Sequence, residues 1–170
     1  MKILITGGGG FLGSRLAKAL KARDPKAQIT LLDMAFPPGL EKEFTYRGEL
    51  DRAQKIAFLQ ELDVLSVPTT YREPKGMFVF EAMACGVPVV QPRHGAFPEI
   101  IERTGGGLVV EPGDPKALAD GIATLRTDTA LAESMSKAGA AGVRRHYTAA
   151  RMAEQVEAVY REIAGTGGSL

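Results

Sequence analysis

Short aliphatic runs alternate along this chain with longer segments in which apolar residues recur every three or four positions. The short runs predict buried strands, and the longer segments predict helices that cover them. We expect strands over residues 3–6, 28–32, 44–46, 64–67, 87–91 and 108–110. We expect helices over residues 12–23, 51–60, 78–85 and 98–103, and three more that begin after the capping residues Asp114, Asp128 and Thr148.

Strands that alternate with helices predict right-handed crossovers and a parallel sheet that is covered on both faces. The expected fold class is α/β: a three-layer, doubly wound, Rossmann-like sheet in a single domain, residues 1–164, with extra C-terminal helices. The last helix carries an apolar stripe of Met152, Val156, Val159 and Ile163. Residues 165–170 show no periodicity, and we interpret them as a flexible tail or a remnant of cloning.

The charge balance and the cysteine content exclude several classes of function. Lys and Arg total 21 against 20 for Asp and Glu, so the net charge of +1 offers no basic surface for nucleic acid or an anionic membrane. Cys85 is the single cysteine beside 2 histidines, which nearly excludes a structural zinc site and suits a reducing compartment. Because no apolar run is long enough to span a membrane or direct secretion, we expect a cytoplasmic protein.

Glycine is enriched to 20 residues, and a cluster of them follows the first expected strand. The spacing Gly8-x-Gly10-x-x-Gly13 between a strand and a helix is typical of a dinucleotide-binding turn. Asp33 ends the second strand, where a carboxylate can accept hydrogen bonds from ribose and repel a 2′-phosphate, so NAD is favoured over NADP. The candidate cofactor-binding residues are Gly7, Gly8, Gly10, Phe11, Leu12, Gly13 and Asp33. The alternative is that the glycines only permit close packing of the strand and helix.

Residues 1–38 resemble the start of NAD-dependent extended short-chain dehydrogenases and epimerases, which open with Thr-Gly-x-x-Gly-Phe-Leu-Gly. This resemblance implies a catalytic Tyr-x-x-x-Lys pair, and Tyr71 and Lys75 have that spacing. Pro74 lies between them and disfavours the helix on which such a pair should lie, so we interpret the match as chance.

A second motif follows the strand near residue 67. It places Glu73 in a loop, Gly76, Met77 and Phe78 at the start of a helix, and Glu81 within that helix. Early helical N–H groups can bind a diphosphate, and carboxylates can accept hydrogen bonds from sugar and ribose hydroxyls. The two glutamates, with seven residues between them, and the sequence from about residue 44 to 164 resemble the C-terminal donor-binding domain of retaining glycosyltransferases of GT-B architecture.

This second resemblance implies that Glu73 contacts the donor sugar and Glu81 the nucleotide ribose. The alternative is that Glu81 makes structural hydrogen bonds and Glu73 is solvated. The family's acceptor domain and its cationic diphosphate loop have no counterpart in the sequence, and the dehydrogenase substrate lobe is missing as well. Because charge on a departing diphosphate requires stabilisation, we expect neither sugar transfer nor hydride transfer, and no catalytic residue.

Two half-motifs from different families favour an engineered chimera as the first interpretation. It would be a Rossmann-like scaffold without turnover that requires no cofactor, with possible binding of NAD or another nucleotide. The alternative is a fragment of a glycosyltransferase donor domain that binds a nucleotide sugar through Glu73, Gly76, Met77, Phe78 and Glu81. The apolar stripe of the last helix leaves a monomer or a homodimer open.

Overall fold

The computed structural model describes residues 2–6, 11–26, 28–32 and 50–166. The strands are β1 (Lys2–Thr6), β2 (Gln28–Leu32), β3 (Val64–Ser66), β4 (Val89–Pro92) and β5 (Gly107–Val110). The helices are α1 (Phe11–Arg23), α2 (Arg52–Gln60), α3 (Met77–Ala84), α4 (Phe97–Thr104), α5 (Pro115–Thr127), α6 (Thr129–His146) and α7 (Ala149–Thr166). The elements follow the expected pattern closely, and the strand expected at residues 44–46 lies outside the described residues.

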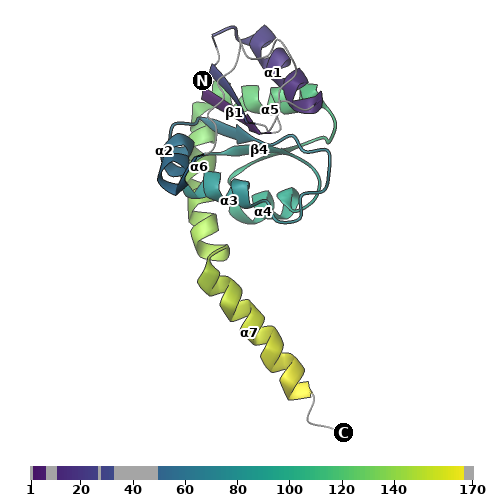
Figure 1. The fold of residues 1–170 in the computed structure, drawn as a ribbon, viewed down its shortest axis with the longest axis vertical. Coiled ribbons are helices and arrows are strands. Elements are labelled where there is room, and N and C mark those ends of the chain that lie inside the picture. Colours follow the sequence, from purple (N-terminus) through teal and green to yellow (C-terminus); the bar gives the residue numbers. More distant parts are fainter. Residues whose placement is uncertain (1, 7–10, 27, 33–49, 167–170) are drawn as a thin grey trace.

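The strands form one parallel sheet in the order β2-β1-β3-β4-β5 (Figure 1). The chain runs from β1 outward to β2, then crosses back to β3 on the other side of β1 and continues to β5. The direction of winding therefore reverses between β1 and β3, where Ile5 is in register with Ser66. In open parallel sheets, the carboxyl ends of the strands at such a reversal form the usual ligand crevice.

Helices cover both faces of the sheet, which confirms the expected fold class. On one face, α1 packs against α5, and the ion pairs Arg23–Asp120 and Arg126–Asp24, at 2.6 Å each, join α5 to the last residue of α1 and the residue that follows it. On the other face, α3 packs against α2 and α6, and α4 also packs against α6. Successive strand residues enter opposite cores: Val89 belongs to the core beneath α3 and α4, and Val90 to the core beneath α1 and α5.

Helix starts follow the capping residues that the sequence predicted. Asp114 precedes Pro115 and accepts hydrogen bonds from the N–H groups of Lys116 and Ala117 at 2.8 and 3.0 Å. Asp128 caps α6 through Leu131, and Thr148 accepts from the N–H of Arg151 at the start of α7. These contacts confirm the expected starts of the three C-terminal helices.

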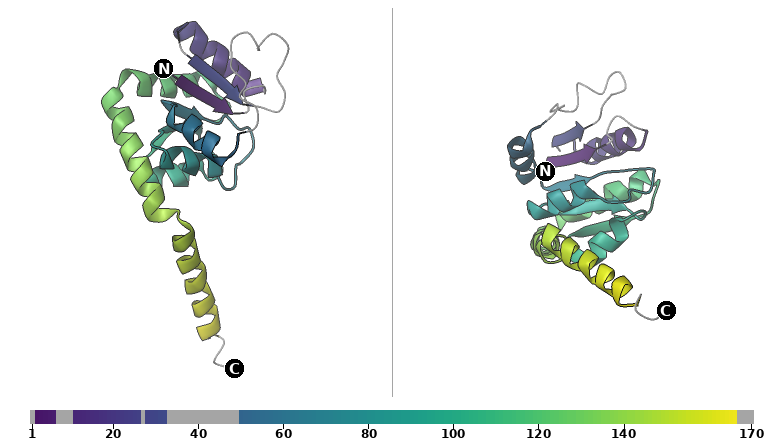
Figure 2. Two further views of the ribbon diagram at one scale, coloured as in Figure 1. Left: turned by 60° about the vertical axis from the view of Figure 1, so that its left-hand side comes forward. Right: turned by 60° about the horizontal axis from the view of Figure 1, so that its bottom comes forward.

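The last helix projects from the body of the molecule (Figures 1 and 2). Its large apolar side chains are exposed: Met152 (65%), Val156 (43%), Val159 (51%), Tyr160 (68%) and Ile163 (64%). Within the described ranges, no helix combines the length and the apolar character needed to cross a membrane.

Candidate functional site

The loops that follow β3 and β4 interlock at the carboxyl edge of the sheet. The N–H of Ala96 donates to the carbonyl oxygen of Glu73 at 2.8 Å, and His94 Nε2 lies 2.8 Å from the carbonyl oxygen of Thr69. Gly95 has φ +57°, and a Cβ there would lie 2.3 Å from the oxygen of Glu73. This close backbone approach fixes the position of the loop that carries Glu73.

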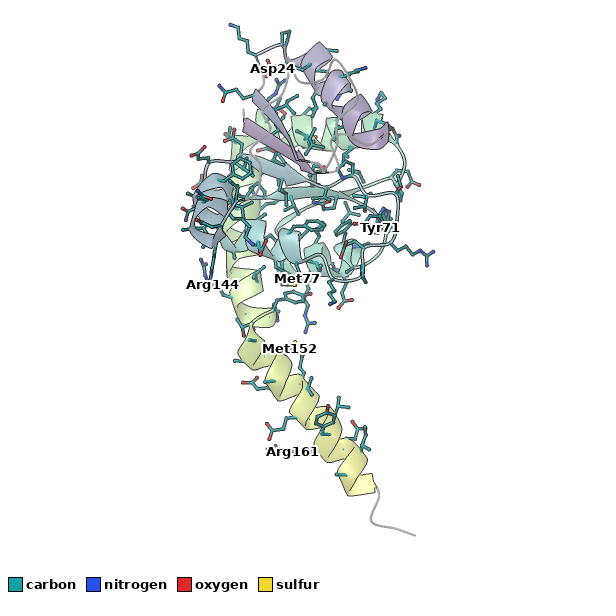
Figure 3. The ribbon with its side chains drawn as sticks, viewed as in Figure 1. Asp24, Tyr71, Met77, Arg144, Met152 and Arg161 are labelled. Atoms are coloured by element: carbon teal, nitrogen blue, oxygen red, sulfur yellow. The ribbon has the colours of Figure 1, made fainter. Side chains whose placement is uncertain are left out.

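The carboxylate of Glu73 is held by its own loop. Its Oε1 accepts hydrogen bonds from the N–H groups of Lys75 and Gly76, each at 3.0 Å. These backbone donors, Gly76 first, lower the pKa of Glu73, and the Tyr71 hydroxyl contributes another hydrogen bond. Partial burial, followed by the charge of Glu73, raises the pKa of Tyr71. The loop therefore carries an ionised carboxylate at Glu73, and the phenol of Tyr71 on the same loop is exposed (Figure 3).

Gly76 allows α3 to begin directly after this loop. Its φ is +66°, in the left-handed region that favours glycine, and a Cβ there would come within 2.9 Å of Ile100 Cδ1. The carbonyl oxygen of Gly76 accepts from the N–H groups of Val79 and Phe80. In the described part of the chain, the N–H groups of Met77 and Phe78 have no hydrogen-bond acceptor. The start of α3 therefore has donors available for an anion.

Glu81 lies further along α3 and forms an ion pair with Lys55 of α2. The distance from Lys55 Nζ to Glu81 Oε1 is 2.6 Å, and the side chains are 42% and 39% exposed. Cys85 lies nearby, and its pKa is raised by burial first and by Glu81 second. The thiol is thus mainly protonated at neutral pH and is not an activated nucleophile.

Buried polar side chains that the sequence analysis missed lie at the ends of β3 and β4. Ser66 and Gln91 are fully buried, and Gln91 Oε1 accepts from the N–H of Val67 at 3.2 Å. Ser66 Oγ, Gln91 Nε2 and His94 Nδ1 have no partner among the residues described. Their sequence positions give no signal, because a polar residue within a short strand is more often exposed. These polar atoms lie at the same sheet edge as the Glu73 loop.

The structure describes every residue of the second motif but only part of the glycine turn. Phe11, Leu12 and Gly13 form the start of α1 after β1, as expected for a strand–turn–helix unit. Gly7, Gly8, Gly10 and Asp33 lie outside the described residues, so NAD binding at this turn stays a prediction. The residues of the second motif, in contrast, are brought together on the β3–α3 connection and on α3 itself.

A family profile described as "Glycosyl transferases group 1" matches residues 17–141. Phosphatidyl-myo-inositol mannosyltransferase of Mycobacterium leprae is 35% identical over 132 residues, which are 78% of this chain and 35% of the relative. N-acetyl-alpha-D-glucosaminyl L-malate synthase of Bacillus anthracis is 27% identical over 147 residues, which are 86% of this chain and 38% of the relative. The chain therefore spans little more than a third of these relatives.

Solved structures of similar proteins show the same fold. Sucrose-phosphate synthase of Thermosynechococcus elongatus has a TM-score of 0.78 at 26% identity, over 97% of this chain and 46% of its own. Anabaena HepE in complex with UDP has a TM-score of 0.77 at 23% identity, over 94% of this chain and 48% of its own. The matched region is about half of each structure.

These comparisons overturn two expectations. The interpretation as an engineered chimera is wrong, since the family match starts at residue 17, inside the stretch 1–38 that resembles dehydrogenases, and its relatives are natural enzymes. The expectation of a non-enzymatic scaffold is wrong as well, because the named relatives are transferases and a synthase. A strand–glycine turn–helix unit occurs in unrelated families, so its presence alone does not identify one. The chain belongs to the glycosyl transferase group 1 family.

Proposed function

We propose that this chain is the nucleotide-sugar-binding part of a glycosyltransferase. The observation that carries the proposal is the placement of Glu73, the start of α3 and Glu81 along one connection at the carboxyl edge of a parallel sheet. Family membership supports it, and so does the UDP in the Anabaena HepE structure. A complete transferase also needs a site for the acceptor, and the greater length of the relatives leaves room for one.

Each part of the connection suits one part of a nucleotide sugar. The Glu73 carboxylate, whose Oε1 is already bound by backbone N–H groups, can accept a sugar hydroxyl through its second oxygen. The available N–H groups of Met77 and Phe78, together with the dipole of α3, favour the diphosphate. Glu81 can accept a hydrogen bond from ribose. As the sugar forms its new bond to an acceptor oxygen, which gives up its proton, the bond between sugar and diphosphate breaks, and the same N–H groups stabilise the charge that develops on the departing phosphate.

Calorimetric titration of the purified chain tests the proposal. The ligands are UDP, GDP and ADP, their glucose or mannose derivatives, and NAD for comparison with the glycine turn. We expect one nucleoside diphosphate series to bind, and we expect Glu73→Gln to weaken the nucleotide sugar selectively and Glu81→Gln to weaken the sugar and the free diphosphate alike. Each loss should be about tenfold, as for a hydrogen bond to a charged group.

Glu133→Gln is the matched control, because Glu133 is an exposed glutamate that pairs with Lys137 on α6, outside the site. This variant should bind as the unaltered chain does. Binding of NAD with no binding of any nucleoside diphosphate would contradict the proposal, and so would unchanged affinity in both site variants.

A further inference from the structure

Lys55 reaches Glu81 from a different helix. Lys55 lies on α2 and Glu81 on α3, and 26 residues separate them in the sequence. Their contact at 2.6 Å is both a hydrogen bond and an ion pair, and it is a part-buried one. Only Oε1 of Glu81 is engaged, and within the described ranges Oε2 accepts no hydrogen bond. One carboxylate oxygen is thus anchored, and the other is available to a ligand.

We propose that Lys55 is a positioning residue that orients the Glu81 carboxylate for the ribose hydroxyls of the bound nucleotide. This inference rests on the proposed function. A glutamate side chain has three rotatable bonds, and an unanchored carboxylate samples several rotamers, most of which do not face the ligand. A fixed acceptor loses less conformational entropy on binding, so anchoring by Lys55 raises the affinity for hydroxyl groups in particular.

The groups around the pair do not orient the Glu81 carboxylate in place of Lys55. Arg144 is also near, but its guanidinium donates to the carbonyl oxygen of Ala84 at 3.3 Å and not to Glu81. Cys85 faces the same charges and remains a neutral thiol. The start of α2 is itself fixed by a capping box between Asp51 and Gln54, which holds the helix from which Lys55 extends. The backbone from which the Lys55 side chain extends is therefore held in place.

The positioning role of Lys55 is tested by measuring the binding of UDP and of 2′,3′-dideoxy-UDP. If GDP or ADP binds better, that nucleotide and its dideoxy analogue are used instead. The ratio of the two dissociation constants reports the contribution of the ribose hydroxyls alone. We expect a ratio of about ten in the unaltered chain, from hydrogen bonds to a charged acceptor. Lys55→Met should reduce this ratio about three- to fivefold, in line with the strength of a partly exposed ion pair, and Lys55→Arg should restore most of it.

Two further variants separate positioning from other effects. In a Glu81→Gln background, Lys55→Met should not change the ratio further, because the group that it positions has been altered. Lys137→Met removes an exposed pairing lysine on α6 and should leave the ratio unchanged. Thermal unfolding of each variant shows whether it is folded, and Lys55→Gln, which also removes the charge, provides the same test if Lys55→Met does not fold.

The outcomes distinguish this inference from the function on which it rests. If no nucleoside diphosphate binds, the proposed function fails and the role of Lys55 fails with it. If UDP binds and Glu81→Gln abolishes the preference for ribose hydroxyls while Lys55→Met retains it, only the positioning role is overturned. Equal weakening of UDP and the dideoxy analogue in Lys55→Met would show general charge attraction and would also overturn it.

Discussion

Gly95 is the residue on which the geometry of the Glu73 loop depends most directly. Its φ of +57° is unfavourable for other residues, and the space that a Cβ would occupy is filled by the backbone of Glu73. Neither problem is relieved by a change of side-chain rotamer, because both involve main-chain atoms. The contact fixes the position of the β4–α4 loop relative to the β3–α3 loop.

We predict that Gly95→Ala lowers the free energy of unfolding by about 3 kcal/mol and weakens nucleotide binding, since left-handed strain and backbone displacement add. Gly113→Ala is the matched control: it also has a positive φ, of +74°, but no atom lies within 4 Å of its added Cβ. That control should cost only about 1 kcal/mol and leave binding unchanged. Chemical denaturation measures both variants, and equal costs would contradict the role of the Glu73 contact.

Part of the candidate site could be predicted from the sequence, and the rest could not, for a physical reason. Glu73, Gly76 and Glu81 are close in the chain, so their spacing on a loop and a helix could be interpreted directly. Lys55 belongs to another helix, and a contact between helices depends on how they pack, which the spacing of residues does not report. Ser66 and Gln91 were missed because the strand pattern marks apolar positions only.

Among the elements, α5 has a start that combines two separate sequence signals. Asp114 satisfies two N–H groups of the first turn, and Pro115 occupies a position that needs no N–H donor. The helix that follows covers the sheet beside α1 and buries Leu118, Ile122 and Leu125. Its stability therefore matters to the packing of β1 and α1 as well.

We predict that Asp114→Ala lowers the free energy of unfolding by about 1 kcal/mol, because two backbone donors lose their acceptor. Asp114→Asn retains an acceptor and should cost much less. Urea denaturation followed by circular dichroism distinguishes the two variants. An Asn variant as unstable as the Ala variant would show that the charge of Asp114, and not its capping hydrogen bonds, stabilises α5.

The elements were predictable because strands and helices differ in hydrophobic period and because caps and prolines mark helix ends. The interpretation of residues 1–38 as one half of a chimera was not correct, although the expected strand and helix are present as β1 and α1. β1 lies between β2 and β3 in the sheet, so this unit is part of the same parallel sheet as the remainder. The glycine motif predicts such a unit but does not identify the family, whereas the motif around Glu73 and Glu81 indicated the family that the comparisons show.

At the scale of the whole molecule, α7 leaves apolar surface uncovered. Met152, Val156, Val159 and Ile163 follow one another at intervals of four, three and four residues, the spacing of a coiled-coil seam. The ion pairs Arg151–Glu154 and Arg161–Glu157 occupy other faces of the helix. A projecting helix of 18 residues is only marginally stable in water by itself. Covering its apolar stripe would therefore stabilise the helix.

We predict that the chain forms a homodimer through α7, because two such stripes can bury each other. The double variant Val156→Glu and Val159→Glu should weaken dimerisation at least about tenfold by placing charge in the seam. Glu157→Gln is the control on a face away from the stripe. Light scattering measures the mass against 18.1 kDa for one chain, and a mass that stays at this value at every concentration would contradict the prediction.

The projecting helix also affects how fast the molecule moves through solution. A compact body with a long extension experiences more friction than a sphere of the same mass, so even a single chain should elute early from a gel-filtration column (Figure 2). Removing residues 149–170 should therefore delay elution by more than the lost mass accounts for. The sedimentation coefficient of the shortened chain should approach the value for a smooth sphere.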